Sequence, residues 1–258
     1  MAPPPPPAWL PAALSHPAAA LVATLLLAAL LAFFLLRSHG GAGGGRAGGL
    51  LLVGPCGAGK TTLFLRLRDG APPAAGTVAS MQENDGTVRM PGGGSGELRL
   101  VDLPGHATFR HRLAPRLRDA AGVVFLLDAV VVTPHHAEAA ELLYELLSSP
   151  GFAGRRPPLL IACNKADRGH DAHSPAFIGR TLEKQLDAMR RTRAASMGGG
   201  GADGGGGAAG DSLAGALQHP DKPFAFDGLR SKVTIAEMSA LNGDVKAVAD
   251  FAAACGLL

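Results

Sequence analysis

A glycine-rich stretch near residue 54 has the spacing of a phosphate-binding loop. Residues 54–61, GPCGAGKT, fit the pattern G-x-x-x-x-G-K-[ST], between a predicted strand and a predicted helix. In such a loop the glycines let backbone N–H groups surround phosphate oxygens, and the helix amino terminus adds partial positive charge. We expect Lys60 to reach the β- and γ-phosphates and the Thr61 hydroxyl to ligate Mg²⁺. The candidate phosphate-binding residues are Gly54, Cys56, Gly57, Ala58, Gly59, Lys60, Thr61 and Thr62.

A second stretch, NKAD at residues 164–167, follows the apolar run LLIAC. The carboxylate of Asp167 can accept hydrogen bonds from the ring N1–H and the exocyclic amine of guanine. Adenine offers neither donor, and an unpaired buried carboxylate would then disfavour it strongly. Asn164 and Lys165 complete this motif, and the pair Ser239-Ala240 is a weaker candidate for a backbone N–H to the guanine oxygen. The two motifs together predict binding of GTP or GDP with Mg²⁺.

The stretch LVDLPGH at residues 100–106 ends an apolar run in an aspartate and a Pro-Gly turn. Asp102 is expected to hold Mg²⁺ through a water, and the N–H of Gly105 to contact the γ-phosphate. His106 stands where glutamine is expected in most GTP switches. Two interpretations stay open: a neutral imidazole that orients the attacking water, or a turn residue without a catalytic role. The side chain of Cys56 would crowd that water, so we expect slow hydrolysis that a partner could stimulate.

The amino terminus predicts a membrane anchor. Residues 18–36, AAALVATLLLAALLAFFLL, carry no charge and at about 1.5 Å per residue span about 28 Å, the thickness of a bilayer core. A cleaved signal peptide and a buried core helix are the alternatives; the first lacks a basic start and the second a polar face. Arg37 and Arg46 follow the span and place the main domain in the cytosol. Residues 1–17 then form a short lumenal end, and residues 37–49 a glycine-rich tether.

Residues 50–258 predict one α/β domain, a doubly wound, mainly parallel six-stranded sheet with helices on both faces, because near-continuous apolar runs alternate with helical patterns. The predicted strands are Leu50–Val53, Thr87–Met90, Leu98–Leu103, Val123–Leu127, Leu159–Cys163 and Val233–Met238. The predicted helices begin at Lys60, His136, Ser174 and Asp244. The low-complexity residues 196–212 are expected to form a disordered loop within the domain.

The composition argues against a nucleic-acid partner and indicates a reducing compartment. The 258 residues carry a net charge of +3, too little to argue for direct nucleic-acid binding. Three cysteines far apart in sequence offer no disulfide framework and no metal spacing, which indicates a reducing compartment.

The motifs GPCGAGKT, DLPGH and NKAD, in this order and spacing, resemble those of small GTPases of the Arf-like branch. LIACNKAD, LEKQLDAMRRTR, PFAFDGL and the amino-terminal anchor are more similar to the β subunits of signal recognition particle receptors. The resemblance covers about residues 20–258. It implies a P-loop GTPase anchored in the endoplasmic reticulum membrane. Its GTP-bound domain would bind the amino-terminal domain of the receptor α subunit, forming a heterodimer that tethers co-translational targeting.

The resemblance also implies a switch hydroxyl within AAGTVASMQEN that senses Mg²⁺ and the γ-phosphate. Thr77 is our first choice as this metal ligand, and Ser80 is the alternative. Other functions stay open: a GTP-bound scaffold with negligible hydrolysis, an Arf- or Sar-type trafficking GTPase, and a translation factor. The last two fit poorly, because residues 18–36 have no polar face and no further RNA-binding domain is evident.

Overall fold

The protein is described by a computed structural model covering residues 48–74, 76–78, 80–91, 97–106, 111–198 and 223–258. The chain divides into residues 1–46 and a compact unit from Ala47 to Leu258. The predicted lumenal end, anchor and nearly all of the tether lie outside the described residues. Within the described ranges, no helix combines the length and apolar character needed to cross a membrane.

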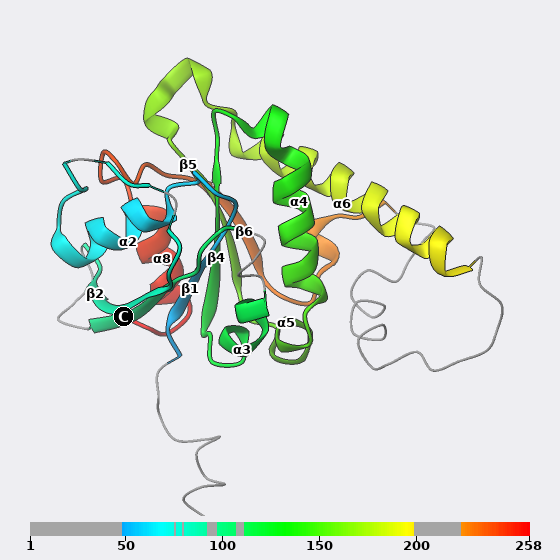
Figure 1. Ribbon diagram of the computed structural model, residues 1–258, viewed down its shortest axis with the longest axis horizontal. Coiled ribbons are helices and arrows are strands. Elements are labelled where there is room, and N and C mark those ends of the chain that lie inside the picture. Colours follow the sequence, from blue (N-terminus) through cyan, green and yellow to red (C-terminus); the bar gives the residue numbers. More distant parts are fainter. Residues whose placement is uncertain (1–47, 75, 79, 92–96, 107–110, 199–222) are drawn as a thin grey trace, which may run out of the picture. The chain divides into compact units, whose positions relative to one another are not determined.

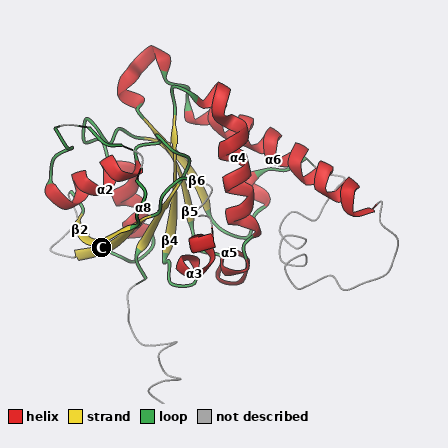
Figure 2. Cartoon of the chain, viewed as in Figure 1, coloured by secondary structure: helices red, strands yellow, loops and turns green. Residues whose placement is uncertain are grey.

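The core of the unit is a six-stranded sheet with strand order β2-β3-β1-β4-β5-β6. Its strands are β1 (Leu50–Val53), β2 (Asn84–Arg89), β3 (Glu97–Asp102), β4 (Gly122–Asp128), β5 (Leu159–Asn164) and β6 (Val233–Glu237). All neighbouring pairs are parallel except β2–β3, which is antiparallel. The expected mainly parallel sheet is therefore confirmed, and Figure 2 shows its strands between the helices.

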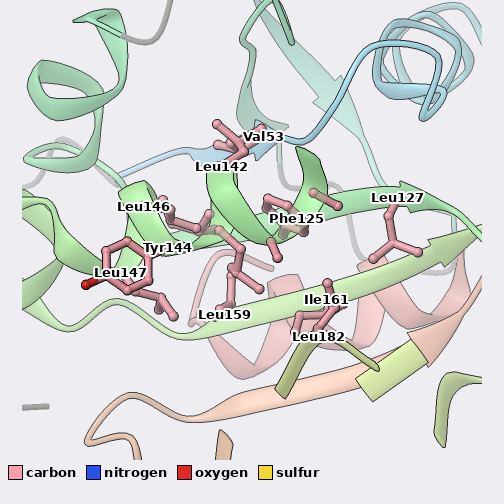
Figure 3. Packing of buried hydrophobic residues seen from close by; sticks show 14 of the residues in the cluster. Val53, Phe125, Leu127, Leu142, Tyr144, Leu146, Leu147, Leu159, Ile161 and Leu182 are labelled. Atoms are coloured by element: carbon pink, nitrogen blue, oxygen red, sulfur yellow. The ribbon is translucent and has the colours of Figure 1, made fainter. Parts of the chain in front are cut away.

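Helices cover both faces of this sheet (Figure 1). They are α2 (Lys60–Asp69), α3 (Leu113–Leu117), α4 (Val132–Ser148), α5 (Pro150–Arg155), α6 (Pro175–Gly198) and α8 (Lys246–Ala254), with short 3-10 turns η4 (Ala166–Asp171) and η5 (Phe226–Gly228). Helices α2 and α8 pack on one face, and α3 to α6 on the other. Successive side chains of β4 point to opposite faces of the sheet. Phe125 therefore belongs to the apolar cluster under α3 to α6, and Leu126 to the cluster under α2 and α8. Figure 3 shows the first of these clusters.

Some predicted boundaries differ from the structure. Helix α4 begins at Val132 rather than His136, and the proline in its first turn is compatible with this start, because the N–H it lacks would have no helical partner there. Helix α6 continues to Gly198, so the first residues of the predicted loop 196–212 are helical, and the rest lie outside the described residues. The short helices α3 and α5 were not predicted.

Candidate functional site

The predicted phosphate loop joins the carboxyl end of β1 to the amino terminus of α2. Gly59 adopts φ 90°, in the left-handed region, and a Cβ there would lie 2.2 Å from Nδ2 of Asn164. Gly105 approaches the same loop, since a Cβ on it would lie 2.6 Å from the carbonyl oxygen of Gly54. Both positions need glycine because other segments pack directly against the loop.

Lys60 is buried inside this loop. Its Nζ donates to the carbonyl oxygens of Gly54 at 2.7 Å and Pro55 at 2.9 Å. Burial lowers the pKa of Lys60, and the carboxylate of Asp102 acts in the opposite direction. The ammonium group therefore lies where anionic phosphate oxygens would favour its charged form.

Thr61 and Asp102 form a hydroxyl–carboxylate pair next to the loop. Thr61 Oγ1 donates to Asp102 Oδ2 at 2.8 Å, and Asn84 Nδ2 donates to the same oxygen at 2.9 Å. Asp102 Oδ1 is buried and has no hydrogen-bond partner among the described residues. Burial raises the pKa of Asp102, while the hydrogen bonds from Asn84 and Thr61 and the charge of Lys60 lower it.

This donor set fits a magnesium ion. Hydroxyl and carboxylate oxygens are ligands that Mg²⁺ accepts, either directly or through its retained waters. The buried Asp102 Oδ1 supplies an acceptor that the protein itself does not satisfy. Among the described residues no group of three or more His, Cys, Asp or Glu side chains could hold a metal, and Asp102 is the one carboxylate that the pair with Thr61 supplies.

The structure separates the two candidates for the switch hydroxyl. Ser80 Oγ lies 2.7 Å from Thr61 Oγ1, beside the hydroxyl–carboxylate pair. Thr77 is exposed, and its Oγ1 lies 3.0 Å from Thr62 Oγ1 instead. The geometry thus favours Ser80, the alternative, over Thr77 as the hydroxyl nearest to a metal at Thr61.

The predicted guanine motif joins three loops. Asn164 ends β5, donates from Nδ2 to the carbonyl oxygen of Ala58 at 2.7 Å, and accepts at Oδ1 from the N–H of Ala240 at 2.9 Å. Asp167 Oδ1 accepts from Ser239 Oγ at 2.6 Å. These hydrogen bonds bring the phosphate loop, the NKAD stretch and the Ser239-Ala240 turn together.

A cavity of about 320 Å³ opens along the phosphate loop. It is lined by Cys56, Gly57, Gly59, Lys60, Thr61, Thr62, Thr77, Val78, Ser80, Pro104, Gly105 and Lys165. On the side of the DLPGH stretch this lining ends at Gly105, and His106 is exposed beyond it. His106 is thus next to the cavity in sequence but is not part of its wall.

Three residues near the site were not predicted from the sequence. Asn84 contacts Asp102, Arg66 of α2 donates to the carbonyl oxygens of Ala240 and Leu241, and Asp128 forms an ion pair with the Lys165 ammonium. Asp128 could have been found, because it ends a buried strand at the same edge of the sheet as Asp102 and Asn164. The other two carry no motif, and only the folded packing shows them.

The strand order, the phosphate loop at the end of β1 and the N-K-x-D stretch at the end of β5 define the class of this protein, a small P-loop GTPase fold. The same fold is found in the Arl6 BBS3 small GTPase of Trypanosoma brucei, with a TM-score of 0.54 and 16% identity over 80% of this chain and 96% of that one. It also occurs in the SRβ-GTP/SRX complex of Chaetomium thermophilum, with a TM-score of 0.54 and 22% identity over 74% and 93%.

The family model of the signal recognition particle receptor beta subunit matches residues 46–233. The chain is 33% identical over 195 residues to signal recognition particle receptor subunit beta of Mus musculus, covering 75% of this chain and 69% of the mouse protein. The solved structure of the mammalian SRP receptor aligns with a TM-score of 0.64 and 31% identity, over 80% of this chain and 99% of that one. The chain therefore belongs to the family of signal recognition particle receptor beta subunits, and the predicted resemblance is confirmed.

Proposed function

We propose that this protein is a membrane-anchored GTP-binding subunit of a signal recognition particle receptor in the endoplasmic reticulum. It would bind the amino-terminal domain of the receptor α subunit when GTP is bound, and so tether co-translational protein targeting. The observation that carries the nucleotide part is the position of Asn164, whose amide joins the phosphate loop to the Ser239-Ala240 turn. The neighbouring carboxylate of Asp167 would then discriminate guanine from adenine.

The phosphates and the metal ion would each be held by groups along this loop. The backbone N–H groups of Gly54 and of residues 56–62, together with the ammonium of Lys60, would hold the phosphates. Thr61, Ser80 and Asp102 would hold Mg²⁺, which supplies charge neutralisation between the β- and γ-phosphates. Gly105 packs against the phosphate loop, so its N–H is suited to report whether the γ-phosphate is present.

Nucleotide selectivity tests this proposal. The full chain, purified in detergent, is expected to bind GTP far more tightly than ATP in a fluorescence competition assay. The variant Asp167→Asn should lose GTP affinity and gain affinity for xanthine nucleotides, because the amide can donate to the additional carbonyl of xanthine. Equal affinity of the wild-type chain for GTP and ATP would contradict the proposal.

The partner surface is proposed at the first switch segment. Val78 and Met81, three residues apart on this segment, are 90% and 67% exposed. Ordering of this segment by GTP would make the apolar surface available in one nucleotide state. Capture of the α subunit from detergent-solubilised membranes should therefore be stronger with GTP than with GDP, and equal capture would contradict a nucleotide switch.

A second candidate function is a GTP-bound scaffold that barely hydrolyses. Two observations favour it: Cys56 places a side chain in the wall of the nucleotide cavity, and His106 lies outside that wall. Single-turnover hydrolysis, with and without the α-subunit domain, separates the two candidates. Rapid phosphate release by the isolated chain would exclude the scaffold, while hydrolysis that requires the partner and is lost in His106→Ala would make His106 catalytic.

The predicted anchor has its own test. If residues 18–36 span the membrane, alkaline extraction should leave the protein in the membrane fraction. Release into the supernatant would favour the peripheral attachment of Arf- and Sar-type GTPases.

A further inference from the structure

We infer that Asn84 is a positioning residue for the magnesium site, holding the Asp102 carboxylate so that its second oxygen faces the metal. This inference rests on the proposed nucleotide-binding function and adds to it a residue outside the nucleotide motifs. The observation behind it is an uneven distribution of hydrogen bonds over one buried carboxylate. Oδ2 of Asp102 receives two donors, and Oδ1 receives none from the described residues.

The two donors to Oδ2 come from different elements. Thr61 belongs to the first turn of α2 and donates at 2.8 Å, while Asn84 begins β2 and donates at 2.9 Å. Thr61 is itself a proposed metal ligand, so its hydroxyl has a second task when Mg²⁺ is present. Asn84 has no such task, and its amide alone can hold Oδ2 independently of the metal. A carboxylate held at one oxygen in this way presents the other in a fixed direction.

The sheet places Asn84 for this role. In the antiparallel pair β2–β3, Asn84 lies directly opposite Asp102. The side chains of such a pair lie on the same face of the sheet with Cβ atoms about 5 Å apart, within reach of a short amide. The β2–β3 register therefore places the Asn84 amide beside the Asp102 carboxylate, and no flexible loop is needed for this contact.

Asn84 also connects the metal site to the first switch. It follows Ser80 by four residues, and Ser80 lies 2.7 Å from Thr61. Residues 80–84 thus begin beside one member of the hydroxyl–carboxylate pair and end beside the other. Substitution of Asn84 should consequently raise the Mg²⁺ concentration that tight nucleotide binding needs. It should change nucleotide binding in the absence of Mg²⁺ much less.

The experiment measures release of a fluorescent GDP analogue from the full chain in detergent, over a range of buffered free Mg²⁺. Mg²⁺ is expected to slow release, and the midpoint is the Mg²⁺ concentration at which half of this slowing is reached. For Asn84→Ala we expect this midpoint to rise about tenfold, the size of effect that outer-shell residues have on metal sites. Release in excess EDTA should stay within about twofold of wild type. Asn84→Leu, which keeps the size of the side chain but has no donor, should behave like Asn84→Ala. Thr87→Ala, an exposed position on the same strand, is the matched control and should follow wild type.

Each outcome bears on the inference. An unchanged Mg²⁺ response in Asn84→Ala, or a wild-type response in Asn84→Leu, overturns it and leaves the proposed function standing. Release that is accelerated equally with and without Mg²⁺ overturns it too, since it would indicate a purely structural role. A wild-type chain that binds no guanine nucleotide overturns the proposed function and this inference together.

Discussion

Arg66 is predicted to control how long a guanine nucleotide stays bound, although it lies outside every nucleotide motif. Its Nη1 donates to the carbonyl oxygens of Leu241 at 2.6 Å and Ala240 at 3.3 Å. The turn leaves room for it, because a Cβ on Gly243 would lie 2.2 Å from Nη2 of Arg66. Helix α2 therefore supports, from its far end, the same turn that Asn164 holds from inside the site.

The size of the effect follows from these contacts. A hydrogen bond from a charged donor contributes about 1.5–3 kcal/mol. The 3.3 Å contact is long and the side chain is half-buried, so we take the lower end, about 1.5 kcal/mol in total. Loss of this support corresponds to about a tenfold faster release of GDP, because changes at one interface appear mainly in dissociation rates. The same free energy cannot also be lost in full from the nucleotide-free chain, so the melting temperature of that chain should fall by less than the roughly 3–6 °C that 1.5 kcal/mol would give.

The assay compares Arg66→Ala with Arg68→Ala by release of a fluorescent GDP analogue and by thermal unfolding. Arg68 is the matched control, since it lies on the same helix, is exposed, and pairs with its neighbour Asp69. Gly243→Ala should speed release by more than Arg66→Ala, because the added Cβ would displace the guanidinium and Gly243 also adopts a φ of 87°. Wild-type release from Arg66→Ala, or an equal effect of Arg68→Ala, would refute the reasoning.

Two further predictions concern the cysteines and the sheet edge. Cys56 is exposed, whereas burial raises the pKa of Cys163 to about 12, so at pH 8 about one Cys163 in ten thousand is a thiolate. Brief iodoacetamide treatment followed by mass spectrometry should label Cys56 and spare Cys163, with GDP protecting Cys56; equal labelling of the two would contradict this. The hydrogen bond from Arg99 lowers the pKa of Asp85, so its stabilisation is fully present above the unfolded pKa of about 3.9 and is lost as the pH falls through the lower pKa of the folded state. Because this pair is well exposed, Asp85→Asn should lower the melting temperature by about 1–2 °C at pH 7 and by less at pH 3, and an equal shift at both values would contradict the linkage.

The centre of the sheet could be predicted from sequence because strands β1, β4 and β5 are buried on both faces. Runs such as Leu159–Asn164 are apolar at every position but the last, and no amphipathic helix shows that pattern. Helix α5 could not be found by periodicity, because six residues give fewer than two turns. Its local signal was the cap: Ser149 accepts from the N–H of Phe152, with Pro150 at the first helical position.

The positions of the motif segments could be predicted from the sequence, because each motif follows a strand. The orientation of single side chains on irregular segments could not. The phosphate loop and the NKAD stretch follow strands, so their positions were determined once the strands were known. The choice between Thr77 and Ser80 was not, because spacing along an irregular segment does not say which hydroxyl turns toward Thr61. Asn84 was hidden for a related reason, since its contact depends on the β2–β3 register and not on neighbouring residues.

These cross-strand contacts bear on how the switch could work. If the only link between the first switch and the metal were Ser80, its loss would free the whole segment at once. The second link at Asn84 limits the freed chain to the residues that precede it, because the start of β2 stays paired with Asp102. Coupling between nucleotide and partner would then be carried by a short segment that includes the exposed Val78 and Met81. A short segment loses less conformational entropy on ordering, so less of the free energy of Mg²⁺–GTP binding is spent there and more remains for partner binding.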